Sequence, residues 1–258
     1  IHDEFFSEQT IVNIIQVGVG VIGRELLAQI EDTQNKLIQE QNLNIRVIGI
    51  ANSKKMILDP EGIDLNNWEQ QLQDRKSESD IPGLINTVNN INLTDCVFVD
   101  CTASEKISEL YGTALKKRIS VVTANKIANT GPYQVYKKLN KLSDKYNVHY
   151  LYETTAGAGL PIIDTVKNLL DSGDKILKLE AILSGTISYI FNSFTSDKKF
   201  SQVVREAKKL GFTEPDPRDD LNGKDFARKL LLLCREFGEE IEMDDIKACL
   251  FYASRLTK

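Results

Sequence analysis

The sequence of 258 residues predicts an α/β protein, in which a parallel sheet comes first and a second domain of α+β type follows. Three observations carry this prediction. Short apolar runs alternate with helical stretches up to residue 153, a glycine-rich turn follows the first run, and the pattern changes afterwards. Such alternation is typical of a doubly wound parallel sheet with helices on both faces.

Five apolar runs predict the buried strands of this sheet. They are residues 11–17, 45–50, 96–100, 119–123 and 148–152. Runs of this length and composition suit strands that are covered on both faces. Helical periodicity is clearest over residues 104–117 and 132–146, and a further helical stretch covers 24–30. We therefore expect the sheet domain to span residues 11–153, after a linker of residues 1–10.

The pattern of the second domain, residues 154–258, mixes helices with one strand. The helices are expected over residues 160–171 (with Pro161 in the first turn and Ser172-Gly173 as the stop), 201–210 and 224–236. Residues 175–183 alternate apolar and charged positions, which predicts a half-buried strand. A polar loop of residues 212–223 separates the last two helices. We expect this region to bind the substrate.

Composition and charge exclude several classes of function. The net charge is only −5, and no long run of lysine and arginine occurs, which argues against a nucleic-acid partner. No apolar stretch approaches the roughly 20 residues needed to span a bilayer. The first six residues lack the basic start and apolar run of a signal peptide. We expect a cytoplasmic protein without a membrane partner.

Cysteine and histidine are too few and too scattered to predict a metal site. The four cysteines lie at positions 96, 101, 234 and 249, and none has the spacing of zinc ligands. We interpret them as buried thiols in a reducing compartment, with a catalytic thiol as the minor alternative. Histidine occurs only at positions 2 and 149. A general acid in this chain is therefore expected to be Lys, Asp, Glu or Tyr.

The turn after the first strand has the spacing of a dinucleotide-binding loop. Gly18 permits the tight turn, Gly20 lets the backbone approach a pyrophosphate, and Gly23 lets the helix pack close to the strand. Backbone amides at the start of the helix, including Val21 and Ile22, would bind the anion. Because this loop joins an apolar strand to a helix, it predicts a Rossmann-type domain that binds NAD or NADP.

The end of the second strand bears on the choice between the two cofactors. Ala51 is followed by Asn52, Ser53, Lys54 and Lys55, where an acidic residue would select NAD by binding the ribose 2′-hydroxyl. A hydroxyl with two lysines favours NADP or the use of both cofactors. The alternative, a solvated turn in which the lysines have no ligand, stays open.

Two lysines are candidates for chemistry. Asp225 and Lys229 lie four residues apart, on one face of a helix, and an exposed ion pair is the simpler interpretation. The preceding segment, 214–220, holds four carboxylates and two prolines, which suits binding of an ammonium group; a solvated acidic loop is the alternative. Lys126 follows the fourth strand at its carboxyl end, where ligands bind in open α/β sheets.

These residues carry a resemblance to the homoserine dehydrogenases. The run 207–229 (AKKLGFTEPDPRDDLNGKDFARK) is similar to the signature of that family, and further similar segments extend over nearly the whole chain. They are residues 18–23, 100–104 (DCTAS), 123–126 (TANK), 153–160 (ETTAGAGL) and 183–189 (LSGTISY). The second strand most resembles the dehydrogenase part of bifunctional aspartokinase–homoserine dehydrogenases, and residues 1–6 resemble the end of the preceding kinase regulatory domain.

The resemblance implies NAD(P)-dependent interconversion of L-homoserine and L-aspartate 4-semialdehyde, in threonine and methionine biosynthesis. It implies that Lys229 is the acid/base and that Asp225 orients it. Glu214 and Asp220 would hold the amino acid, beside Gly185 and Thr186, with Lys126 between cofactor and substrate. Further cofactor contacts are implied for Ala51, Thr102, Ala103 and Gly211. A monovalent cation, Na⁺ or K⁺, would bind backbone carbonyls of Glu153, Ala156, Ala158 and Leu160.

Three departures from the family pattern are visible. Ala124 stands where proline is frequent, and Ala156 stands where a larger aliphatic residue is usual. Family members continue beyond residue 258 into part of a dimer sheet, so we expect a homodimer or higher oligomer and a chain that lacks its C-terminal part. The rival hypotheses are a truncated nucleotide-binding module without turnover and a purely structural half of a bifunctional enzyme.

Overall fold

The computed structural model describes residues 9–75, 78–91, 93–213 and 216–246. The chain divides into two compact units, of which the first combines Ile1–Ala128 with Gln134–Tyr152. The second combines Asn129–Tyr133 with Glu153–Lys258. Residues 1–8 of the expected linker, which include the expected kinase-like tail of residues 1–6, lie outside the described residues, whereas Thr10 already belongs to the first strand. The domain limits 11–153 and 154–258 stay a prediction.

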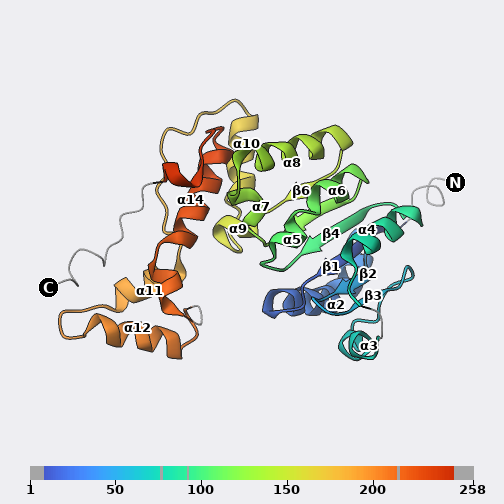
Figure 1. The fold of residues 1–258 in the computed structure, drawn as a ribbon, viewed down its shortest axis with the longest axis horizontal. Coiled ribbons are helices and arrows are strands. Elements are labelled where there is room, and N and C mark those ends of the chain that lie inside the picture. The colour runs from blue at the N-terminus through green and yellow to red at the C-terminus, as the bar shows by residue number, and fades with distance from the viewer. Residues whose placement is uncertain (1–8, 76–77, 92, 214–215, 247–258) are drawn as a thin grey trace. The chain divides into compact units, whose positions relative to one another are not determined.

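The first unit is built on a six-stranded sheet with the order β3-β2-β1-β4-β5-β6 (Figure 1). The strands are β1 (Thr10–Val17), β2 (Leu43–Ala51), β3 (Met56–Leu58), β4 (Cys96–Asp100), β5 (Ser120–Thr123) and β6 (Tyr150–Leu151). All neighbours pair in parallel except β3, which runs antiparallel to β2 at the edge. The predicted α/β fold with a Rossmann-type parallel sheet is therefore confirmed, and each of the five expected strands forms.

Helices connect the strands of the first unit. They are α2 (Val21–Gln41), α3 (Trp68–Asp74), α4 (Ile81–Asn90), α5 (Glu105–Ser108), α6 (Tyr111–Lys116), α7 (Ile127–Thr130) and α8 (Tyr133–Tyr146). The helical stretch expected over 104–117 forms as two short helices, because it is interrupted between α5 and α6. There the amide of Leu110 bonds to the carbonyl of Ile107, three residues back, so the regular α-helical hydrogen bonding breaks.

Alternate residues of β1 face opposite sides of the sheet, and both sides are buried. Ile14 packs in a core with Leu27 and Ile30 of α2, and Trp68 of α3 belongs to the same cluster. Ile15, the next residue, has no exposed surface although it points to the other face. Burial of each such side chain stabilises the fold by about 1.5–3 kcal/mol. The sheet is therefore a rigid support for the loops at its edges.

The described part of the second unit is helical. Its elements are α9 (Thr154–Gly157), α10 (Ile163–Asp171), α11 (Gly185–Ser193), α12 (Phe200–Lys209), α13 (Pro217–Leu221), α14 (Lys224–Glu236) and the 3₁₀ turn η1 (Met243–Asp245). The expected stop of α10 is confirmed, because Gly173 has a φ of +86° and its amide bonds to Leu170 O at 3.0 Å. In the described part of the chain, no helix is both long and apolar enough to cross a membrane.

Three details of the second unit differ from the sequence prediction. Residues 175–183 form no strand, because none of the described residues pairs with them, and Leu177 is 94% exposed. A strand needs a neighbour that takes up its backbone hydrogen bonds. Pro161 precedes the first turn of α10 rather than lying within it. The expected loop 212–223 contains α13, whose first turn begins at Pro217 and is capped by Asp216.

Candidate functional site

The glycine loop lies where the strand order of the sheet reverses. From β1 the chain passes to β2 on one side, and β4 adjoins β1 on the other. The amide of Gly18 donates to Ala51 O at 2.9 Å, and the amide of Cys101 donates to Val17 O at 2.9 Å. These bonds bring the carboxyl ends of β1, β2 and β4 together, at the switch point where open α/β sheets bind ligands.

Sterics explain why glycine occupies two positions of this loop. Gly18 has a φ of +96°, and a Cβ there would lie 2.8 Å from Thr102 Cγ2. A Cβ on Gly23 would lie only 2.0 Å from Gly18 O. Gly20, by contrast, faces open space, since no atom lies within 4 Å of its Cβ position. The loop is therefore tight at both ends and accessible in the middle, which fits a bound pyrophosphate.

The start of α2 leaves two apolar side chains in solvent. Val21 and Ile22 are 87% and 59% exposed. Their backbone amides belong to the first turn of the helix, where amides lack partners within the helix. Gly20 is the N-cap and offers no side chain to satisfy them. An anion at this helix end would find both free donors and the positive end of the helix dipole.

Sequence reasoning missed Gln16, whose side chain holds the glycine loop through hydrogen bonds. This side chain is fully buried in β1. Its Nε2 donates to Gly23 O at 2.8 Å and to Gly18 O at 3.2 Å, so one amide group holds both ends of the loop. The signal was a polar residue within an apolar run, because a buried strand rarely tolerates glutamine without hydrogen-bond partners.

Among the described residues, only one of the two lysines at the end of β2 has a hydrogen-bond partner for its ammonium group. Asn52 Oδ1 accepts from the amides of Lys54 and Lys55 at 2.8 and 2.7 Å and so closes the turn. The ammonium group of Lys55 donates to Gln73 O and is therefore engaged. Ser53 and Lys54 are exposed. Ser53 and Lys54 are therefore the candidates for the hydroxyl and the cation that the sequence predicts near a 2′-phosphate.

The remaining predicted residues of the first unit lie in loops at the same edge of the sheet. Thr102 and Ala103 follow β4, and Lys126 follows β5, which pairs with β4. Thr102 is also the residue whose methyl group limits the space at Gly18. The first unit therefore gathers all of its predicted cofactor residues at the carboxyl ends of its strands.

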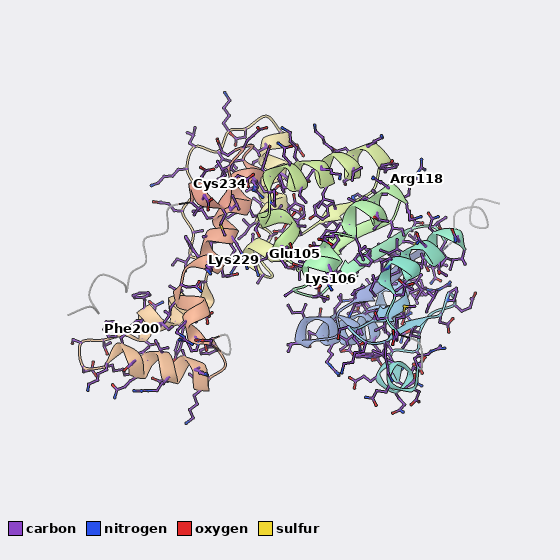
Figure 2. All side chains as sticks on the ribbon, in the orientation of Figure 1. Glu105, Lys106, Arg118, Phe200, Lys229 and Cys234 are labelled. Carbon is purple, nitrogen blue, oxygen red and sulfur yellow. The ribbon has the colours of Figure 1, made fainter. Side chains whose placement is uncertain are left out.

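Lys229 lies near the middle of α14 (Figure 2) and makes two close polar contacts. Its Nζ is 2.8 Å from Asp225 Oδ2, and it donates to the carbonyl of Leu183 at 2.7 Å. The ion pair expected from the i, i+4 spacing is present, yet the lysine side chain is only 16% exposed. An exposed, interchangeable surface pair is therefore the weaker interpretation.

The partner carbonyl of Lys229 precedes two other predicted residues. Leu183 leads into Ser184, which caps α11, and Gly185 and Thr186 form its first turn. The hydroxyl of Thr186 donates to Phe212 O at 2.5 Å. Gly211, with a φ of +77°, comes directly before that carbonyl. These contacts bring the start of α11, the end of α12 and the centre of α14 into one cluster.

The acidic segment is partly engaged within itself. Asp216 Oδ1 accepts from Arg218 Nε at 2.9 Å, and these hydrogen bonds lower the pKa of the Asp216 carboxyl to about 2. Asp216 is therefore occupied by Arg218, and it is not among the carboxylates expected to bind a substrate. Asp220 lies in α13, which packs against α14. Glu214 lies outside the described residues.

Glu153 organises the segment that the resemblance links to a cation. Its Oε1 accepts from the amides of Ile162 and Ile163 at 2.6 and 2.8 Å, and its Oε2 accepts from Asp164 at 2.8 Å. The Glu153 carboxylate thus caps the start of α10 and closes the loop between Glu153 and that helix. Ala158 has a φ of +54° and a ψ of −113°, a conformation that strains any residue with a Cβ.

Two of the carbonyls expected to bind the cation already accept backbone bonds. Leu160 O accepts from Ile162 at 2.9 Å, and Glu153 O accepts from Ala156 at 3.3 Å. A carbonyl oxygen has two lone pairs, so a cation contact remains compatible with both bonds.

Burial makes the described cysteines poor nucleophiles. It raises the pKa of the Cys96 and Cys101 thiols to about 11, and the neighbouring carboxylates of Asp95 and Asp100 add to the effect. Burial also raises the pKa of Cys234. The thiolate is the reactive form, so Cys96 and Cys101 hold little of it at neutral pH, and the shift at Cys234 acts in the same direction. The catalytic thiol that the sequence left as a minor alternative finds no support in these three residues.

We expect Cys96 and Cys101 to react with iodoacetamide at pH 7.5 about a hundredfold more slowly than a free cysteine, because so little thiolate is present. Mass spectrometry of timed samples measures the rate at each position. Reaction of Cys101 at the rate of free cysteine would contradict the protonated state.

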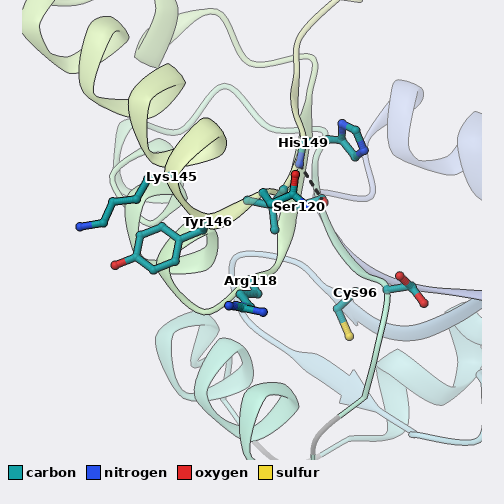
Figure 3. Close-up of a pocket in the computed structure, with 9 residues that line it drawn as sticks. Cys96, Arg118, Ser120, Lys145, Tyr146 and His149 are labelled. Carbon is teal, nitrogen blue, oxygen red and sulfur yellow. Dashed lines mark hydrogen bonds between the residues drawn. The ribbon is translucent and has the colours of Figure 1, made fainter.

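A pocket of about 470 Å³ lies at the opposite, amino ends of β4, β5 and β6 (Figure 3). Arg118, Lys145 and His149 contribute positive or titratable side chains to its lining. Helices α6 and α8 end there, and the partial negative charge of their carboxyl ends stabilises nearby cations. That same charge opposes an anionic ligand, so we assign no site to this pocket.

Comparison with known families covers both units. The sequence profile of the homoserine dehydrogenase NAD-binding domain matches residues 18–153, and the homoserine dehydrogenase profile matches residues 161–252. The bifunctional aspartokinase/homoserine dehydrogenase 2 of Arabidopsis thaliana, described as chloroplastic, is 48% identical over 247 residues. The corresponding bifunctional protein of Haemophilus influenzae is 42% identical over 246 residues.

The alignments cover nearly all of this chain but only a small part of each relative. The alignments include 95% of this chain but only 27% of the Arabidopsis protein and 30% of the Haemophilus protein. The chain thus spans less than a third of the length of these curated relatives.

Solved structures with a similar fold include a homoserine dehydrogenase. A hyperthermophilic archaeal homoserine dehydrogenase in complex with NADPH superimposes with a TM-score of 0.73 at 27% identity, over 89% of this chain and 71% of that one. A Candida auris protein of unknown function superimposes with a TM-score of 0.82 at 32% identity, over 95% of this chain and 68% of that one. The resemblance seen in the sequence is confirmed: the chain belongs to the homoserine dehydrogenase family.

Proposed function

We propose that the protein interconverts L-homoserine and L-aspartate 4-semialdehyde with NADP or NAD, a reaction of threonine and methionine biosynthesis. The observation that carries the proposal is the partly buried Lys229, held between Asp225 and the carbonyl of Leu183. Reduction of an aldehyde requires a proton at the oxygen as the hydride reaches the carbon. A lysine held in place by a carboxylate can donate that proton.

The residues of the first unit suit the binding of a dinucleotide. Bound NAD(P)H supplies the hydride. Gly18, Gly20 and Gly23, with the amides of Val21 and Ile22, would hold the pyrophosphate. Ala51 would border the ribose at the end of β2. Thr102 and Ala103 would contact the nicotinamide half, and Lys126 would reach both cofactor and substrate.

The residues of the second unit suit the binding of an amino acid. Lys229 would donate the proton to the carbonyl oxygen in the reductive direction and accept it from the hydroxyl in the oxidative one. Asp225 holds the ammonium group of Lys229 and would also contact the substrate. Glu214 and Asp220 would bind its amino group, because carboxylates recognise an ammonium ion by charge-assisted hydrogen bonds. Gly185 and Thr186 would line the pocket, and Gly211 would contact the cofactor.

A monovalent cation belongs to the proposal as a structural ion. The backbone carbonyls of Glu153, Ala156, Ala158 and Leu160 would hold Na⁺ or K⁺. The strained backbone at Ala158 supports this assignment, because such strain is found where a segment is held for function.

Self-association and location complete the proposal. Residues 175–183 are unpaired among the described residues, and their exposed side chains Leu177 and Ile182 support a homodimer or a higher homo-oligomer. A cytoplasmic location is proposed from the sequence alone.

A direct test is NADPH oxidation by the purified protein with L-aspartate 4-semialdehyde, followed at 340 nm, with NADPH binding measured on the same sample. Turnover above the enzyme-free rate supports the proposal. Tight NADPH binding without turnover would favour the alternative, a nucleotide-binding module. Neither turnover nor binding would overturn both.

We expect NADPH to be used at least as well as NADH, because Ser53 and Lys54 are exposed at the end of β2 and no acidic residue there would repel a 2′-phosphate. Comparison of kcat/KM for the two cofactors measures the preference. Lys54→Gln should reduce the NADPH value severalfold, whereas Lys55→Gln should change it little, since Lys55 is engaged by Gln73. A strong preference for NADH would contradict the expectation.

A further inference from the structure

A buried carboxylate lies at the end of β4. Asp100 has no exposed surface. Its Oδ1 accepts from the amide of Thr102 at 2.7 Å, and its Oδ2 accepts from the hydroxyl of Tyr111 at 2.5 Å and from Asn125 Nδ2 at 3.1 Å. A carboxylate without hydrogen bonds would be costly to bury, so these three donors replace the water that it loses on folding.

Two of these donors belong to different loops. Thr102 lies in the loop after β4, and Asn125 lies in the loop after β5. Asn125 Nδ2 also donates to Ser104 O at 3.0 Å, and its Oδ1 accepts from the amide of Ile127 at 3.0 Å. The side chain of Asn125 therefore encloses the backbone of Lys126 in a turn and fastens that turn to the neighbouring loop.

Tyr111 provides Asp100 with a hydrogen-bond donor that is fixed in the core. Its side chain is fully buried in α6, and its hydroxyl lies 2.8 Å from Thr123 Oγ1, at the end of β5. Thr123 Oγ1 in turn accepts from the amide of Asn125 at 2.9 Å. Burial and the charge of Asp100 raise the pKa of the Tyr111 hydroxyl, which therefore stays protonated and keeps donating.

We propose that Asp100 is a positioning residue that couples the loop carrying Thr102 to the loop carrying Lys126, so that both hold one geometry for the dinucleotide. The inference rests on the proposed function, since it gives these two loops a common ligand. It goes beyond that function because Asp100 acts through its neighbours. A single buried group that fixes two binding loops reduces the entropy lost when the ligand orders them.

The test combines Asp100→Asn with amide hydrogen exchange and NADPH affinity. Asparagine keeps the size of the side chain but places an NH₂ group against one of the donors. We expect exchange at the Thr102 and Ile127 amides to accelerate together, by about tenfold or more relative to Phe98 inside β4, as for the loss of a buried hydrogen bond. The Kd for NADPH should rise by a similar factor.

A matched control lies at the other end of the same strand. Cys96→Ser changes a buried side chain that contacts the carbonyls of Leu93 and Thr94. This substitution should leave the NADPH affinity unchanged, and it should leave the exchange rates of the Thr102 and Ile127 amides relative to Phe98 unchanged. A general loss of stability would instead accelerate exchange at Phe98 as much as in the loops.

Two results would overturn the inference. One is faster exchange at Thr102 while Ile127 stays protected, because Asp100 would then serve only its own loop. The other is an unchanged Kd for NADPH. If Asp100→Asn does not fold, Tyr111→Phe decides, since it removes one of the hydrogen-bond donors to Asp100. Amide exchange at both Thr102 and Ile127 should then accelerate severalfold, and the Kd for NADPH should rise severalfold. Absence of NADPH binding by the unaltered protein would defeat the proposed function, whereas the exchange experiment would still test the coupling.

Discussion

Lys229→Met should abolish turnover while leaving NADPH binding nearly intact. Methionine fills similar space but cannot donate a proton, and loss of a positioned proton donor costs about 10²–10⁴ in rate. Nucleotide affinity should persist because the glycine loop belongs to the other compact unit. Steady-state kcat and the Kd for NADPH, measured on the same preparation, check both parts.

Lys224→Met is the matched control for this substitution. Lys224 lies in the first turn of the same helix and is exposed. Its replacement should leave kcat within about twofold, in line with the small effect of most surface substitutions. Near-normal kcat in Lys229→Met would remove this lysine from the chemistry.

Gly23→Ala should severely weaken NADPH binding. The new methyl group would lie 2.0 Å from Gly18 O, so either α2 or the loop must move. Overpacking of this kind costs about 1–3 kcal/mol, which corresponds to a roughly five- to 150-fold weaker affinity if the loop gives way. Fluorescence titration with NADPH measures the affinity, and thermal unfolding shows how much of the cost falls on stability.

Gly112→Ala offers the comparison within the same unit. This glycine lies in α6, where a Cβ would meet Leu142 and Leu139 side-chain atoms at 3.6 and 3.8 Å, an ordinary contact distance. Helix propensity favours alanine there, so stability should hold or rise slightly. Equal NADPH affinity in the two variants, without a loss of stability in Gly23→Ala that would account for the clash, would mean that the glycine loop is not the nucleotide site.

Local sequence patterns predicted the elements whose formation depends on local properties. The five apolar runs became strands because each contributes buried side chains to the sheet. The spacing of Asp225 and Lys229 predicted their ion pair because helix geometry fixes it. Strand β3 escaped notice because three residues are too few for periodicity. The strand predicted from the alternation over 175–183 was wrong, since a strand requires a neighbouring strand as well as a pattern.

The parts of the site that sequence could not predict depend on contacts between distant segments. Asp100 was noted only within a family motif, although it joins two loops through Asn125, 25 positions later. Likewise, nothing local predicts that the ammonium group of Lys229 will meet a carbonyl 46 positions earlier. Such pairings follow from the tertiary fold, which brings the ends of separate elements together.

The division of the chain into units has a consequence for dissecting it. The polypeptide leaves the first unit after Ala128, returns at Gln134, and leaves again after Tyr152. The excursion, Asn129–Tyr133, is fastened by Arg235, whose Nη1 donates to Asn129 O at 2.7 Å and whose guanidinium lies 5.6 Å from the centre of the Tyr133 ring. Cleavage near residue 153 would consequently separate this excursion from its anchor, leaving a fragment with an unsupported internal loop. Genetic exchange of either half between relatives is therefore expected to succeed only when residues 129–133 travel with the C-terminal part.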